Sequence, residues 1–91
     1  MDITEVRVKL MTDSSRVKAF VTICFDECFV VHGLKVIDGD QGYFVAMPCI
    51  RDRTGKPRDT AHPITNEMRQ RIETAVLDKY EEVLGLVPPQ I

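Results

Sequence analysis

The stretch VKAFVTICF, residues 17–25, decides the fold because its apolar side chains recur at every second position. A period of two is that of a β-strand, whose successive side chains point to opposite faces. The odd-numbered positions all carry apolar side chains and form one face. The other face includes Phe20 and Cys24 and is also partly apolar, which predicts a strand at the centre of a sheet or at an interface.

The segments on both sides of this stretch continue the strand pattern. Residues 4–10 alternate between apolar and charged side chains, and residues 29–37 and 43–47 are rich in β-branched and aromatic side chains. Gly33 interrupts the second of these runs and predicts a β-bulge or a close backbone approach. Because the connections are short and rich in turn residues, the pattern favours antiparallel strands that pair in chain order.

The period changes to that of a helix near residue 65. Apolar side chains recur at spacings of three and four over residues 68–83, with Thr65 or Asn66 as the predicted N-cap and Gly85 as a stop. The sequence therefore predicts an α+β fold, an antiparallel sheet of about four strands followed by one long C-terminal helix packed on one face.

The length of 91 residues indicates one domain, which we place at residues 1–84, followed by an extended tail at residues 85–91. A chain this short buries only about 60–65% of its unfolded surface, and dimerisation is one way to enlarge so small a core. We find no apolar run of membrane-spanning length and no signal peptide, and the odd number of three cysteines indicates reduced thiols. These features predict a cytoplasmic protein that does not enter a membrane.

Positive charge gathers in one segment of an otherwise acidic chain. The net charge is −2, yet residues 51–71 hold six basic against three acidic residues. Within the irregular, proline-rich loop predicted at residues 48–63, four basic residues fall within eight positions. They are Arg51, Arg53, Lys56 and Arg58. Such a loop either binds phosphate groups or is simply a solvated charge run.

Two other constellations carry titratable or metal-binding groups. Cys24, Cys28 and His32 offer only three of the four ligands that a structural zinc site needs, so buried thiols and a surface histidine are the simpler interpretation.

A second constellation lies inside the predicted loop. Cys49, Asp59 and His62 are a thiol, a carboxylate and an imidazole, the groups of a nucleophilic enzyme. No glycine-rich oxyanion elbow accompanies them, so a small thiol enzyme is the third-ranked hypothesis, and we interpret His62 as ordering the loop before Pro63.

Several motifs resemble a known family. The N-terminal MDITEVR, the later VIDG at residues 36–39, FVAMP at residues 44–48 and RDTAHPI at residues 58–64 carry the similarity, and the last two are the most specific. Over about residues 1–84 the chain resembles the stage V sporulation protein G family, also called septation protein regulators.

The resemblance implies an antiparallel sheet with a C-terminal helix, usually in a homodimer. It implies binding of DNA, and of RNA in some members, in the regulation of gene expression, including cell division and sporulation. It implies no enzyme activity, cofactor, metal or small-molecule substrate. Family members carry adjacent basic residues after the Met-Pro motif; Arg51 and Arg53 match this pattern, whereas Ile50 and Asp52 depart from it.

We therefore predict a nucleic-acid-binding surface built on the basic segment and extended by the start of the helix. Arg71 has the alternative of pairing with Glu67, and Phe20 and Tyr43 either stack on bases or pack within the protein. The competing function is a protein-interaction module that uses a sheet edge or the C-terminal tail. The predicted contact residues are Arg51, Arg53, Lys56, Arg58, Arg69 and Arg71.

Overall fold

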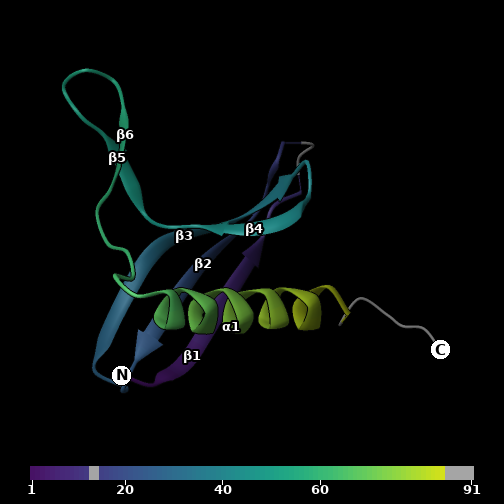
Figure 1. The fold of residues 1–91 in the computed structure, drawn as a ribbon. Helices are drawn as coiled ribbons and strands as arrows, with labels where there is room; N and C mark the ends of the chain where they lie inside the picture. Colours follow the sequence, from purple (N-terminus) through teal and green to yellow (C-terminus); the bar gives the residue numbers. More distant parts are fainter. Residues whose placement is uncertain (13–14, 86–91) are drawn as a thin grey trace.

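The computed structural model describes residues 1–12 and 15–85 of the chain. It contains a four-stranded antiparallel sheet, a helix that crosses one face of this sheet, and a two-stranded hairpin that projects away from it (Figure 1). The predicted α+β fold is confirmed. The sheet strands are β1 (Ile3–Leu10), β2 (Val17–Phe25), β3 (Phe29–Gly39) and β4 (Gly42–Ala46), the hairpin strands are β5 (Cys49–Arg51) and β6 (Pro57–Asp59), and the helix is α1 (Asn66–Gly85).

The four strands pair in chain order, β1-β2-β3-β4, as the short connections predict. Strand β2 lies between two neighbours, with Val21 opposite Val8 on one side and Leu34 on the other. The partly apolar second face of β2 therefore belongs to an interior strand. The edges of this sheet are β1 and β4.

Two backbone features fix the register of β2 and β3. The pairing shifts between Val21 and Ile23, where Gly33 adopts a φ of 91°, so the predicted β-bulge is confirmed. In the turn between the strands, Asp26 and Glu27 have φ values of 51° and 55°. Positive φ at both central residues is the geometry of a type I′ turn, whose twist matches that of the strands it joins.

The core lies between the sheet and α1. Thr65 Oγ1 accepts a hydrogen bond of 3.1 Å from the backbone N–H of Met68, which identifies Thr65 as the N-cap of the helix. Burial of one helix stripe against one sheet face accounts for the buried apolar side chains in the described residues. They are Ala19, Val21, Ile23, Phe25, Leu34, Val36, Val45, Met47, Ile72, Val76 and Tyr80.

One prediction of local structure is wrong. Residues 48–63 were expected to be irregular throughout, but Cys49–Arg51 and Pro57–Asp59 pair as β5 and β6. Every residue of these two short strands is exposed, so they show none of the apolar alternation by which a strand is identified in a sequence. The predicted tail falls largely on residues 86–91, which lie outside the described residues, and the boundary at residue 84 stays a prediction.

Candidate nucleic-acid interface

The β5–β6 hairpin is a separate projection fastened to the sheet at its base. Its register pairs Cys49 with Asp59 and Arg51 with Pro57. At the base, the backbone N–H of Thr60 donates to the carbonyl of Pro48 at 2.8 Å, directly after β4. The chain thus leaves the sheet, turns back over a few residues, and returns to the same point before α1 begins (Figure 1).

Asp52 organises the tip of the hairpin. Its Oδ1 accepts hydrogen bonds from the backbone N–H of Thr54 at 2.8 Å, the Thr54 hydroxyl at 2.6 Å and the backbone N–H of Lys56 at 3.1 Å. Its Oδ2 accepts from Arg58 Nε at 3.0 Å. The bonds from Thr54 and the Arg58 guanidinium lower the pKa of the Asp52 carboxyl to about 2. Asp52 is therefore ionised at neutral pH and holds the turn together.

The role of Asp52 in the turn was not predicted from the sequence. Asp52 was identified only as a residue that departs from the basic pattern of the family after the Met-Pro motif. A signal for this role exists, because an Asp two residues before Thr54 and three before Gly55 is typical of a turn in which the carboxylate accepts backbone N–H groups. Gly55, with a φ of 83°, supplies the left-handed residue of that turn, and its N–H donates to the Asp52 carbonyl at 3.0 Å.

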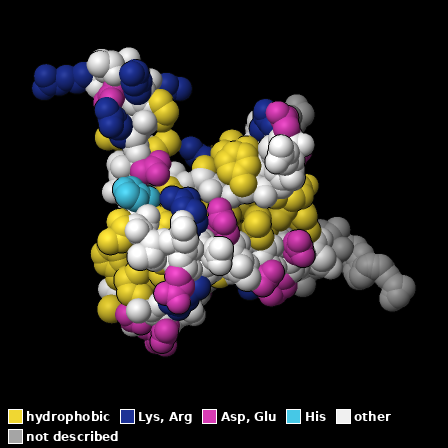
Figure 2. Space-filling model, viewed as in Figure 1, with side chains coloured by type: hydrophobic (Ala, Val, Ile, Leu, Met, Phe, Trp, Pro, Cys, Tyr) yellow, Lys and Arg dark blue, Asp and Glu magenta, His cyan; other side chains and the backbone are white. Residues whose placement is uncertain are grey.

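All four predicted basic residues of the loop lie on this hairpin, where dark blue side chains gather in Figure 2. They fall into two pairs. Arg51 Nη1 donates to the Gly55 carbonyl at 2.7 Å, and Arg58 pairs with Asp52, so both support the hairpin. The side chains of Arg53 and Lys56 make no hydrogen bond or ion pair with any residue that the structure describes. These two exposed cations are available to an external anion.

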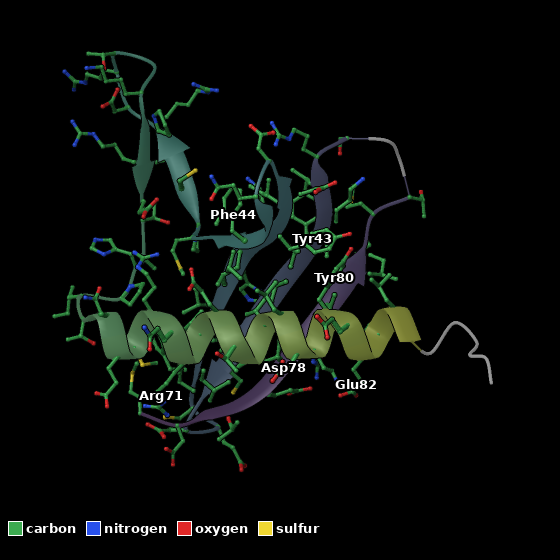
Figure 3. The ribbon with its side chains drawn as sticks, turned by 45° about the vertical axis from the view of Figure 1, so that its right-hand side comes forward. Tyr43, Phe44, Arg71, Asp78, Tyr80 and Glu82 are labelled. Atoms are coloured by element: carbon green, nitrogen blue, oxygen red, sulfur yellow. The ribbon has the colours of Figure 1, made fainter. Side chains whose placement is uncertain are left out.

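Of the two predicted helix arginines, Arg71 lies apart from the hairpin. Arg71 Nη2 donates to the Met1 carbonyl at 3.0 Å and lies 3.8 Å from Asp2 Oδ1, so it contacts the start of the chain and not Glu67. Figure 3 shows Arg71 on the side of α1 away from the hairpin. Arg69 is partly buried on the first turns of α1 and makes no ion pair within residues 1–12 and 15–85.

The two aromatic residues with alternative roles lie on opposite faces of the sheet. Tyr43 packs edge-to-face on Tyr80 of α1, with ring centroids 5.3 Å apart, as the labelled side chains in Figure 3 show. Burial raises the pKa of the Tyr80 hydroxyl. Phe20 is 39% exposed on the face that α1 does not cover. Tyr43 is 49% exposed but packs against another ring, whereas Phe20 has no ring contact with the described residues and is open to a ligand.

Within the described part of the chain, no hydrogen bond joins His62 to Cys49 or to Asp59, although Cys49 and Asp59 are paired across the hairpin. His62 Nδ1 is hydrogen-bonded to the Pro63 carbonyl at 3.1 Å, and His32 Nδ1 to the Thr22 hydroxyl at 3.2 Å. Among the described residues, no three His, Cys, Asp or Glu side chains are grouped to hold a metal ion. The same residues include no helix long and apolar enough to span a bilayer.

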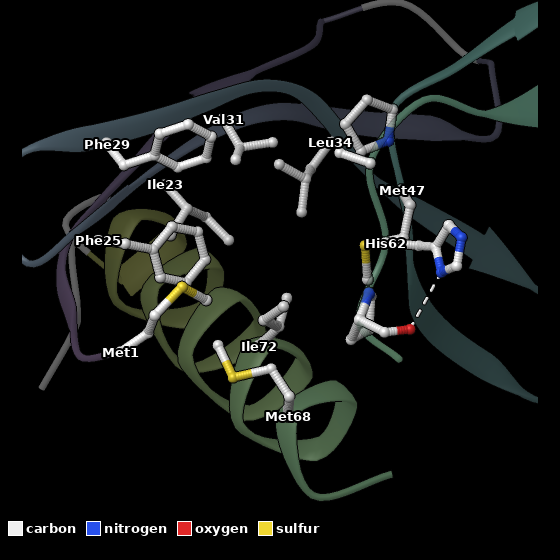
Figure 4. A pocket seen from close by; sticks show the side chains of 13 residues that line it. Met1, Ile23, Phe25, Phe29, Val31, Leu34, Met47, His62, Met68 and Ile72 are labelled. Atoms are coloured by element: carbon white, nitrogen blue, oxygen red, sulfur yellow. Dashed lines mark hydrogen bonds between the residues drawn. The ribbon is translucent and has the colours of Figure 1, made fainter. Parts of the chain in front are cut away.

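An apolar cavity of about 160 Å³ opens between the sheet, the start of α1 and the segment before it (Figure 4). Its walls include Phe25, Phe29, Met47 and Met68, and His62 is the one titratable side chain in its lining. Pockets for drug-sized ligands have volumes of about 300–1,000 Å³ and present several convergent polar groups. This cavity is smaller and almost wholly apolar, so it does not point to a small-molecule substrate.

Comparison with known proteins identifies the family of this chain. The SpoVG family model matches residues 1–82. Proteins named "Putative septation protein SpoVG" are similar over nearly the whole chain. The protein from Caldicellulosiruptor saccharolyticus is 46% identical over 93% of this chain and 97% of its own length. Those from Staphylococcus saprophyticus and Clostridium novyi are 50% and 48% identical, over 97% and 91% of this chain and 87% and 83% of their own lengths. The chain therefore belongs to the SpoVG family.

Proposed function

We propose that this protein is a homodimeric nucleic-acid-binding regulator of gene expression, which binds DNA, and RNA as a further ligand, through the β5–β6 hairpin. The observation that supports this function is the pair of cations at the hairpin tip. Arg53 and Lys56 extend from a projecting ribbon, and no described residue neutralises them. Phosphate oxygens are the natural partners of such exposed guanidinium and ammonium groups.

The dimensions of the hairpin fit the major groove of duplex DNA. The three residues of β5, at about 3.3 Å each, extend about 10 Å before the turn, which exceeds the groove depth of about 8.5 Å. A two-stranded ribbon is one of the two elements that the groove, about 12 Å wide, admits. The base of the ribbon is fixed to β4, so its basic tip enters as a preformed unit.

A homodimer supplies the affinity that one hairpin lacks. Two free cations per protomer make few phosphate contacts, but two linked hairpins bind with a high effective concentration. Large apolar side chains remain exposed on the single chain, among them Phe29 at 60% and Ile64 at 89% exposure. Burial of such side chains against a second copy would supplement a core that is small for a 91-residue domain.

The regulated processes are proposed from the names of the relatives. Because similar proteins are named for septation, we assign the control of cell-division genes to this chain, with sporulation genes in organisms that form spores. Such a regulator works in the cytoplasm. The three cysteines are free in the structure, as a reducing compartment favours.

The test is a salt titration of binding to fluorescein-labelled duplex DNA and to single-stranded RNA. We expect wild-type binding to weaken steeply with salt, and the variant Arg53→Ala/Lys56→Ala to lose about three to four units of the log–log slope on duplex DNA. The expected loss corresponds to two phosphate contacts in each of two protomers, each contributing about 0.9 units of slope. The matched control Lys79→Gln removes a cation from α1 and should leave the slope unchanged.

If the double variant binds duplex DNA as the wild type does, the hairpin is not the contact surface. If wild-type protein fails to bind either nucleic acid at physiological salt, the proposed function is wrong.

A protein-interaction module is the second candidate, because Ile50 is 63% exposed on the hairpin and β1 and β4 leave free edges. An exposed apolar side chain on a projecting hairpin can form part of a protein contact where it joins a larger apolar patch. This function predicts binding of a protein partner that tolerates salt and survives the loss of Arg53 and Lys56. Substitution of Ile50 by Ser would abolish such binding, whereas it adds no charge to the hairpin and would leave the salt slope for DNA in place.

A further inference from the structure

The sheet has a second face that α1 does not cover, and its side chains differ in kind from those of the core. Alternation along each strand places these side chains together, because residues that are paired directly across strands point to the same side. In the register of the sheet, Lys9 pairs with Phe20, Phe20 with Lys35, and Lys35 with Ala46. We call this surface the open face. The members that bear on its chemistry are Glu5, Arg7, Lys9, Phe20, Lys35 and Phe44.

Phe20 is the centre of the open face. It lies on the interior strand β2 and is 39% exposed, with Lys9 and Lys35 directly opposite on the two neighbouring strands. Lys18 lies two residues before it in the chain, at the register irregularity between Val17 and Ala19, so the pairing does not assign it to a face. The aromatic ring of Phe20 is thus flanked by one lysine on each of the two neighbouring strands.

The lysines around Phe20 are not neutralised by the protein. No carboxylate among the described residues lies within ion-pair distance of Lys9 or Lys35. The acid on the open face is Glu5, and its carboxylate is already held by Arg7 at 2.8 Å. The open face therefore carries an excess of positive charge although the chain as a whole is acidic.

A second aromatic ring lies on the same face. Phe44 of β4 is opposite Ile37 and is 46% exposed, with its ring over Gly39, where an added Cβ would meet the ring at 2.9 Å. From Phe20 it is two strands across and two residues along, a distance of about 12 Å by strand geometry. Lys35 stands between the two rings in the register.

We propose that the open face binds single-stranded nucleic acid, with one unpaired base stacked on Phe20 and the neighbouring phosphates held by Lys9 and Lys35. Exposed aromatic rings in a positively charged groove are what sequence-tolerant single-strand binding uses. A duplex cannot place a base on the exposed Phe20 ring, because its bases already stack on one another. The proposal rests on the proposed nucleic-acid function but assigns a surface separate from the hairpin.

The charge distribution argues against a second copy of the chain on the same surface. A two-fold interface sets identical patches against one another, so the lysines around Phe20 would face the lysines of the partner. Like charges placed directly opposite are unfavourable, whereas a polyanion neutralises both the lysines and the exposed ring.

The chain contains no tryptophan, so Phe20→Trp introduces one fluorophore at the site. We would titrate this variant with RNA and DNA single strands of about 12 nucleotides, a length within the usual range of site sizes, and with the duplex of the same sequence. Stacking of a base on the indole predicts strong quenching by the single strands. A duplex bound through the hairpin leaves the fluorescence nearly unchanged.

Anisotropy with labelled single strands supplies the second measurement. Phe20→Ala should weaken binding by about tenfold, as expected for the loss of one stacked base, whereas Phe20→Tyr should bind like wild type. Lys35→Gln should reduce the log–log salt slope by about 0.7 for each protomer in contact with the strand. Lys79→Gln, on the helix side of the sheet, is the matched charge control. Larger losses of affinity with RNA than with DNA single strands would identify RNA as the preferred ligand of the open face.

The hairpin variant separates this inference from the proposed function. Arg53→Ala/Lys56→Ala should lose duplex binding and keep the quenching of Phe20→Trp by single strands. Absence of quenching at strand concentrations that saturate wild-type protein would overturn the inference, and so would unchanged binding by Phe20→Ala. A lower oligomeric mass of Phe20→Ala in sedimentation would also overturn it, because the open face would then be the contact between copies.

Discussion

Asp52 gives the sharpest prediction for the hairpin because it has two separable roles. Its Oδ1 holds the turn through the Thr54 and Lys56 N–H groups, and its Oδ2 neutralises Arg58. Asp52→Asn retains an oxygen acceptor for the turn but removes the negative charge. Asp52→Ala removes the charge and the acceptor together. The two variants therefore separate the charge of the hairpin from its order.

The magnitude for Asp52→Asn follows from the release of Arg58. A guanidinium freed from its ion pair can contact one phosphate, which adds two contacts in a dimer. At about 0.9 per contact, the salt slope on duplex DNA should become steeper by about 1.8 units. A fourfold rise in salt would then weaken the variant about tenfold more than the wild type, and binding at low salt should be tighter.

The assay is fluorescence anisotropy at several salt concentrations, with amide NMR signals of the hairpin as a record of its order. We expect Asp52→Ala to bind less tightly than Asp52→Asn at every salt concentration, because its turn lacks the acceptor for Thr54 and Lys56. Asp59→Asn is the matched control, since it removes a hairpin carboxylate that makes no ion pair with the described residues. Identical slopes for wild type and Asp52→Asn would refute the idea that Asp52 and phosphate compete for Arg58.

Three further predictions concern pH, packing and capping. The carboxyl pKa of Asp52 is about 2 in the folded hairpin against 3.8 in the unfolded chain, so ionised Asp52 stabilises the turn above about pH 4, and this stabilisation is lost as the pH falls through about 2. The amide NMR signals of Thr54 and Lys56 should therefore titrate with midpoints near pH 2, and midpoints near pH 4 would contradict this prediction. Val76→Ala truncates a side chain with no exposed surface and should lower the free energy of unfolding by about 2 kcal/mol and Tm by about 10 °C in calorimetry. Thr74→Ala, at an exposed position of the same helix, is the control and should change Tm little. Thr65→Ala removes the cap hydrogen bond to Met68 and should reduce stability by about 1 kcal/mol in denaturant unfolding, with Thr65→Ser close to wild type as the control; equal losses for Ala and Ser would show that the hydroxyl does not act as the cap.

The sheet and helix were predictable because an element that buries one face carries apolar side chains at a regular spacing in the sequence. Residues 17–25 alternate since one face of β2 packs on α1, and the helix stripe reaches the core at Ile72, Val76 and Tyr80. The bulge at Gly33 was predictable for a related reason, because a glycine within a strand pattern marks a backbone conformation that other residues avoid. In each case the residue types that favour the local conformation are also the ones that the packed fold needs at those positions.

The hairpin and parts of the site were not predictable for the opposite reason. Strands β5 and β6 bury nothing, so no apolar pattern distinguishes them from a loop. Arg71 contacts Met1, 70 positions away, and its distance from the hairpin follows from tertiary packing alone. Tyr43 and Phe20 are both aromatic residues in strands, and only the register shows that one faces α1 and the other the open face.

The charge distribution of α1 bears on why an acidic chain would carry basic surfaces. The last turn of α1 has no basic residue, and Glu81 and Glu82 lie near its C-terminus, where the helix dipole disfavours negative charge. The arrangement therefore does not optimise helix stability. Under the proposed function it has a physical use, since an acidic helix on one side of the sheet repels the phosphate backbone. A polyanion is then directed to the hairpin and the open face, and the low net charge limits nonspecific binding elsewhere on the molecule.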